Sequence, residues 1–164
     1  KEEVILIRVS QIACVIIALV LSSCSTEKHI TSTPPLELVV TLQKTPCYGE
    51  CPVYNFQVLN DGRATLSVGR ITSEKFGLNL KEGDYEGTIN SENIQEITDL
   101  AESLDYHTLN VKYDDEKVMD LPASISSIEG YRVFNRFEGP NLDPLYSLIE
   151  KTMAETMWQP KTEN

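Results

Sequence analysis

The segment from Cys47 to Tyr54, which reads CYGECPVY, constrains the fold of this chain more than any other part of the sequence. Three residues separate its two cysteines, and Gly49 is one of them. A glycine lets the backbone turn sharply, so two such cysteines can approach to the Cα–Cα distance of about 4.4–6.8 Å that a disulfide needs. Strand-like patterns precede and follow the segment. We therefore predict that this cysteine corner (residues 47–52) joins two β-strands.

Apolar and polar residues alternate on both sides of the cysteine corner, with the period of two expected of strands that bury one face. Asn60-Asp61-Gly62 separates two such runs, and this composition is typical of the turn of a β-hairpin. The expected strands cover residues 36–43, 53–59, 63–68, 76–80 and 85–89. Short turns between successive strands predict an antiparallel meander.

Two later segments have a helical period instead. Ser91 is placed to cap the first helix, and Asp143 to cap the second with Pro144 at its first helical position. The expected inward faces are Ile94, Ile97, Leu100, Ala101 and Leu104 in the first helix, and Leu145, Leu148, Ile149, Met153 and Met157 in the second. A last strand pair, 125–128 and 131–137, lies between the helices.

These elements predict an α+β fold, in which an antiparallel sheet made of a strand meander and hairpins packs against two helices. We expect a single domain over residues 36–158, followed by a disordered C-terminal tail at 159–164.

The N-terminal region carries an uninterrupted apolar run at residues 12–21, which is shorter than the roughly 20 residues that a membrane-spanning helix needs. It fits the apolar region of a secretory signal peptide. The run ends in Leu21-Ser22-Ser23-Cys24, which resembles the lipobox of bacterial lipoproteins. Two alternatives remain open: a plain secreted protein, and a signal anchor that is never cut.

The lipobox resemblance implies a signal peptide at residues 1–23 and cleavage before Cys24. It also implies that the Cys24 thiol receives a diacylglycerol, and that the new N-terminus is acylated with a fatty acid such as palmitate. Residues 24–35 then form a flexible tether, which is rich in Ser and Thr and contains a lone His29 that we expect to be exposed to solvent. In this class of proteins, a residue other than Asp after the cysteine favours the outer membrane, and Ser25 fits that rule. The expected location is therefore the bacterial cell envelope, with a lipid anchor as the membrane contact.

The same resemblance implies how the four cysteines are used. Cys14 leaves with the signal peptide and Cys24 is lipidated, so Cys47 and Cys51 remain and are expected to form a disulfide in an oxidising compartment. Two alternatives for this pair stay open. The pattern C-x-x-x-C-P resembles the copper-binding motif of thioredoxin-fold copper chaperones, where His107 would have to complete the site, and a redox-active dithiol is the other alternative.

The motif C-x-G-x-C-P-x-Y from Cys47 to Tyr54, followed by Asp61-Gly62 and by Asp120-Leu121-Pro122, resembles an uncharacterised family of bacterial envelope lipoproteins. The resemblance covers residues 36–158. It implies a compartment and a fold, and it implies no activity.

The net charge of −11 repels phosphate backbones, so we expect no nucleic acid partner. No catalytic, cofactor-binding or metal-binding motif is found, and the acidic run at residues 114–116 lacks the spacing of an EF-hand loop. These observations favour a non-catalytic binding module for a protein or another envelope component. The alternatives are a copper-binding or thiol-redox lipoprotein that uses Cys47 and Cys51, and a hydrolase with an unrecognised carboxylate site.

Overall fold

A computed structural model of the chain describes residues 35–69, 78 and 80–162. The chain divides after Pro34, and the described residues belong to the second unit, Pro35–Asn164. The predicted signal peptide, Cys24, His29 and all of the tether except Pro35 lie outside the described residues. So does the expected strand at 76–80, apart from Leu78, which is buried, and Leu80, which is half-buried.

The described residues contain one sheet of eight strands in the order β5-β7-β6-β1-β2-β3-β4-β8. The strands are β1 (Leu38–Lys44), β2 (Tyr54–Leu59), β3 (Arg63–Val68), β4 (Gly83–Thr88), β5 (Lys112–Tyr113), β6 (Ser124–Ile128), β7 (Tyr131–Asn135) and β8 (Gln159–Pro160). The sequence prediction of an α+β fold with a largely antiparallel sheet and two helices is confirmed.

The strands β1 to β4 follow one another both in the sequence and in the sheet, and each neighbouring pair is antiparallel, so the predicted meander is confirmed. Gly62 forms the turn between β2 and β3 with a φ of 87°, a conformation that glycine adopts without steric cost. Its amide donates a hydrogen bond to the carbonyl of Leu59 at 2.9 Å.

The second hairpin, β6 and β7, is also antiparallel, but β5 pairs with β7 in parallel. None of the strands expected from the sequence covers β5. A strand of two residues has no periodicity to read, so only the tertiary path of the chain reveals it.

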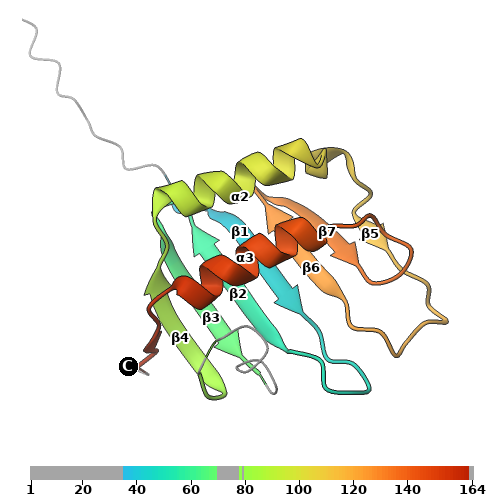
Figure 1. Ribbon diagram of the computed structural model, residues 1–164, viewed down its shortest axis with the longest axis horizontal. Coiled ribbons are helices and arrows are strands. Elements are labelled where there is room, and N and C mark those ends of the chain that lie inside the picture. Colours follow the sequence, from blue (N-terminus) through green and yellow to red (C-terminus); the bar gives the residue numbers. More distant parts are fainter. Residues whose placement is uncertain (1–34, 70–77, 79, 163–164) are drawn as a thin grey trace, which may run out of the picture. The chain divides into compact units, whose positions relative to one another are not determined.

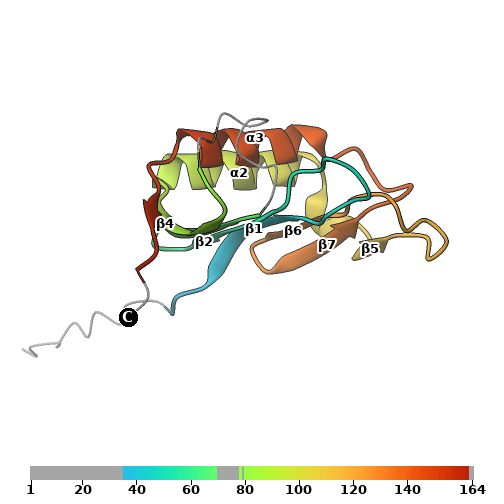
Figure 2. The same cartoon turned by 90° about the horizontal axis from the view of Figure 1, so that it is seen from below.

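Both helices, α2 (Ser91–Ser103) and α3 (Asp143–Glu155), lie on the same face of the sheet, as Figures 1 and 2 show. The first cap differs from the prediction by one residue: Asn90, not Ser91, accepts a hydrogen bond from the amide of Asn93 at 2.7 Å. Asn90 is extended and its side chain can reach the free amides of the first turn. Asp143 also lies inside its helix, after a cap at Leu142 that has no side-chain hydrogen bond.

The core fills the space between the sheet and the two helices. Phe56 of β2 is fully buried, and its ring meets that of Trp158 edge to face at a centroid distance of 6.0 Å. Of the predicted inward helical residues, Ile97, Ala101, Leu145, Ile149 and Met153 are buried, whereas Ile94, Leu100, Leu104 and Leu148 are half-buried against the core. Met157 is a wrong prediction: it lies beyond the end of α3 and is 90% exposed.

The expected disordered tail at 159–164 is also corrected in its first part. Gln159 and Pro160 form β8, which pairs with Glu86 and Tyr85 of β4. Trp158 directs the chain back to the sheet, because its indole N–H donates to the carbonyl of Met153 at 2.8 Å. A contact of this kind depends on the position of α3 and leaves no pattern in the tail itself.

Candidate functional site

The cysteine corner lies between the end of β1 and the start of β2. Cys47 and Cys51 form a disulfide with a Cα–Cα distance of 5.7 Å, which is the pairing that the sequence analysis expected. The residues that flank the corner, Lys44 and Tyr54, are direct partners in the sheet. A strand follows Cys51, where a thioredoxin-fold copper site would have a helix.

His107, the third ligand that a copper site would need, lies at the other end of β1. Its Nε2 atom is 3.7 Å from a carboxylate oxygen of Glu129, and the Glu129 amide donates to the carbonyl of Val39. Val39 and Lys44 are five residues apart on an extended strand, a length of about 17 Å, so the histidine and the cysteine corner lie near opposite ends of β1. Among the residues that the structure describes, no three His, Cys, Asp or Glu side chains are grouped to hold a metal ion.

Next to the cysteine corner, five polar side chains on the helix-covered face form what we call the Lys44–Glu150 cluster: Lys44, Tyr54, Ser124, Tyr146 and Glu150. Lys44 Nζ donates to Ser124 Oγ at 2.7 Å and lies 3.9 Å from Glu150 Oε1. Tyr54 Oη donates to the same carboxylate oxygen at 2.6 Å. The cluster thereby joins β1, β2 and β6 to α3.

The electrostatics of this cluster are dominated by burial. Burial lowers the pKa of Lys44 from its ordinary value, and the carboxylates of Glu150 and Asp143 partly oppose that shift. Burial, together with the charge of Glu150, raises the pKa of Tyr54. The ammonium group also lies 4.5 Å above the ring of Tyr146, a cation–π contact. Lys44, Tyr54, Ser124 and Glu150 satisfy one another, whereas the buried hydroxyl of Tyr146 has no hydrogen-bond partner among the described residues. The contacts of Glu150 fit a role in holding α3 on the sheet.

A related pair, Tyr106 and Ser126, is buried under α2 with a distance of 2.7 Å between the two hydroxyl oxygens. Burial raises the pKa of Tyr106 to about 12, although the hydrogen bond to Ser126 works in the opposite direction. Burial likewise raises the pKa of Tyr146. Several phenols therefore keep their protons in the folded chain at a pH where they lose them in the unfolded chain.

We expect the folded state to lose stability as the pH rises above 10. Between pH 10 and 12 the unfolded chain binds fewer protons than the folded chain. The free energy of unfolding therefore falls by about 2–3 kcal/mol over this range from Tyr106 alone. Urea unfolding at a series of pH values checks this. Tyr106→Phe should flatten the pH dependence, whereas Tyr48→Phe, which alters an exposed ring, should not. Equal slopes in the two variants would contradict the expectation.

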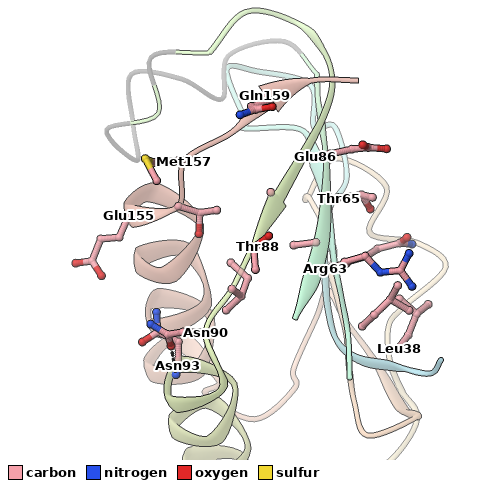
Figure 3. A pocket seen from close by; sticks show the side chains of 16 residues that line it. Leu38, Arg63, Thr65, Glu86, Thr88, Asn90, Asn93, Glu155, Met157 and Gln159 are labelled. Carbon is pink, nitrogen blue, oxygen red and sulfur yellow. Dashed lines mark hydrogen bonds between the residues drawn. The ribbon is translucent and has the colours of Figure 1, made fainter. Parts of the chain in front are cut away.

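A groove of about 910 Å³ runs around the strand β4 (Figure 3). Asn90, Asn93 and Met157 line it on the side of the helices, and Leu38, Arg63 and Thr65 line it on the other side. Its two labelled carboxylates, Glu86 and Glu155, point in opposite directions. A hydrolytic site of the glycosidase type uses two carboxyl groups that converge on one bond, and this groove does not bring these two together.

The face of the sheet that points away from α2 and α3 carries no described helix, as Figure 2 shows. Side chains on this open face come from the positions that alternate with the buried ones, and they form two rows that cross the strands. The first row, in sheet order, is Arg132, Ser127, Thr41, Gln57, Thr65 and Glu86. The second is Phe134, Ile125, Gln43, Asn55, Ser67 and Asp84.

Within these two rows, hydroxyl and amide side chains occupy the strands β1, β2 and β3. Arg132 lies on β7 towards one side of the sheet, whereas Asp84 and Glu86 lie on β4 towards the other. Outside the two rows, Arg63 of β3 adds an exposed cation to this face, paired with Asp61. A sheet face without a covering layer, rich in groups that donate and accept hydrogen bonds, can make specific contacts to another molecule.

Sequence reasoning located the cysteine corner and missed the open face. Alternation identified the polar positions of each strand, but the strand order decides which of them become neighbours. Likewise, Lys44 and Glu150 are separated by more than one hundred residues, and no local pattern connects them. A lysine at an inward-facing position of β1 was the one available signal.

The fold and the surface define an α+β protein with an eight-stranded sheet, in which both described α-helices cover one face and no described helix covers the other. A family described only as a domain of unknown function, DUF6438, matches residues 38–151, and the chain belongs to this family. No curated protein and no solved structure matches the chain. Within the described ranges, none of the helices has the length and apolar character required to cross a bilayer.

Proposed function

We propose that this chain is a bacterial envelope lipoprotein, anchored through lipid on Cys24, whose folded unit is a non-catalytic binding module. The open face of the sheet carries the proposal for the folded unit, because it offers a broad, polar contact surface that none of the described helices covers. The lipobox Leu21-Ser22-Ser23-Cys24 carries the proposal for the anchor. A tether of about a dozen residues would hold the module at the membrane, with the outer membrane as the preferred location.

The disulfide supports the same compartment. Small disulfide loops persist where the surroundings are oxidising, as in the bacterial envelope, and they are rare in the cytosol. The Cys47–Cys51 loop contains three intervening residues, so its stabilising effect is local: it rigidifies the corner next to the Lys44–Glu150 cluster. A thiol-redox or copper function finds less support, since a strand follows the pair and His107 lies at the opposite end of β1.

The mass of the intact protein extracted from membranes, measured without reduction, tests the anchor. We expect cleavage before Cys24, an added mass from two or three acyl chains, and a further loss of two hydrogens from the Cys47–Cys51 disulfide. Cys24→Ala should abolish both lipid attachment and cleavage, because alanine lacks the sulfur atom that accepts the lipid and cleavage follows lipid attachment. Cys14→Ala is the matched control and should mature normally. An uncut and unlipidated wild-type chain would overturn the anchor.

A further inference from the structure

The open face has a charge pattern that is complementary to itself. Its first row starts with a cation, Arg132, continues through four uncharged polar side chains, and ends with an anion, Glu86. The midpoint of the row lies between Thr41 and Gln57, which are direct partners on β1 and β2. The midpoint of the second row also lies between β1 and β2. This row runs from Phe134 on β7 to Asp84 on β4.

Two copies of this face can be packed on each other by a two-fold axis that lies in the plane between the two sheets. The axis runs parallel to the strands and passes over the midpoint between β1 and β2. Under that operation β7 of one copy lies over β4 of the second copy. Arg132 then faces Glu86 of the second copy, and Ser127 faces Thr65 of the second copy. The contact between Arg132 and Glu86 occurs twice, because a two-fold interface uses the same patch on both partners.

From this geometry we infer that the occupant of the open face is a second copy of the chain, bound face to face in a symmetric dimer. The inference rests on the proposed function in one respect, namely that the open face is the binding surface. A second copy offers a surface that is already described, and its presence would explain why opposite charges stand at the two ends of the first row with uncharged side chains between them.

The two charged residues are available for such a contact. Arg132 is exposed and makes no ion pair with any residue that the structure describes. Glu86 has a partner, Lys161, at 3.9 Å, but both side chains are more than half exposed, and exposed pairs of this kind exchange readily with other partners.

The size of the face indicates a weak dimer. Six strands at spacings of about 4.8 Å and about 20 Å of strand length present roughly 500 Å² on each copy. The two copies together would bury about 1,000 Å², which is less than the roughly 1,200–2,000 Å² of stable interfaces and in the range of weak, transient ones. Two copies anchored in one membrane share a thin layer, where a weak and polar contact is populated more than in dilute solution.

Charge reversal tests this arrangement. Two full-length copies with different affinity tags are produced together, cross-linked chemically while in the membrane and then extracted in detergent, and the fraction of one copy that is captured with the other is measured. The wild-type copies should be captured together. Arg132→Glu in both copies, or Glu86→Arg in both, should lower capture about tenfold or more, because each replaces two attractions with two repulsions.

The decisive sample mixes the two variants, with Arg132→Glu in one copy and Glu86→Arg in the other. Every contact is then attractive again, so capture should return to near the wild-type level, which a misfolded variant could not achieve. Lys151→Glu and Glu96→Arg, exposed changes on the helices, are the matched controls and should leave capture unchanged.

Failure of wild-type copies to be captured together would overturn the dimer, and so would failure of the mixed sample to recover. Neither outcome concerns the anchor, since the intact mass reports acylation independently. If acylation is found without self-capture, the lipoprotein proposal stands and the second copy is the wrong occupant.

Discussion

Phe56→Ala is expected to bring the folded unit to the edge of unfolding. Phe56 is fully buried on the central strand β2, and its ring contacts that of Trp158. Removing a buried phenylalanine side chain costs about 3–5 kcal/mol, because the apolar transfer energy is lost and a cavity remains. The total stability of a domain is about 5–15 kcal/mol, so this one change removes a large part of it.

Urea unfolding followed by far-ultraviolet circular dichroism measures the effect. Trp158 is the single tryptophan of the chain, and its fluorescence offers a second probe within the same core. Gln57→Ala is the matched control: it lies next to Phe56 on the same strand but on the open face, and it should change stability by less than about 1 kcal/mol. A similar loss in both variants would show that the burial assigned to β2 is wrong.

The second large effect is expected from Glu150→Ala. This change leaves the buried hydroxyl of Tyr54 without its acceptor and takes away the carboxylate nearest to Lys44. Unsatisfied buried donors cost about 1–3 kcal/mol, and breaking a buried charge pair costs about 3–5 kcal/mol. Because the cluster retains some contact with water, we expect a total loss of about 2–4 kcal/mol.

Glu150→Gln distinguishes the two contributions, since the amide oxygen can still accept from Tyr54 while the charge is lost. Without that charge the pKa of Lys44 falls further. The unfolded chain then binds more protons than the folded chain over a wider range below 10.5, so the stability of the Gln variant should rise more steeply with pH across that range. Glu155→Ala, at the exposed end of α3, is the control. If Glu150→Ala is as stable as this control, the cluster is not what holds α3 to the sheet.

The proposed function assigns membrane contact to the lipid on Cys24 and protein contact to the open face of the sheet. The lipid on Cys24 would provide the membrane contact, so the folded unit needs no basic or apolar face for that purpose. This agrees with an open face made of hydroxyl and amide groups. It also means that the anchor and the dimer can be tested independently, one by mass and the other by charge reversal.

Local patterns were sufficient for most elements of the fold. The alternation of Phe56 and Val58 with Gln57 predicted β2 and its buried face, and the Asn60-Asp61-Gly62 turn predicted the hairpin. Strand and helix periods depend on neighbours two to four residues away, so they can be read without coordinates. The two-residue strands β5 and β8 were not predicted, because they are too short to show a period. They are defined only by their pairing with a strand that is distant in the sequence.

The sequence by itself determined the α+β class, the antiparallel meander and the position of the cysteine corner between two strands. It also carries the lipobox from which the anchor is proposed. Tertiary structure alone decided that Lys44, Tyr54 and Glu150 meet and that His107 lies away from the cysteines. It also decided that polar residues of six strands form one row with Arg132 at one end and Glu86 at the other. The physical reason is that each of these features depends on strand order and helix placement, which arise when distant segments bury their apolar faces together.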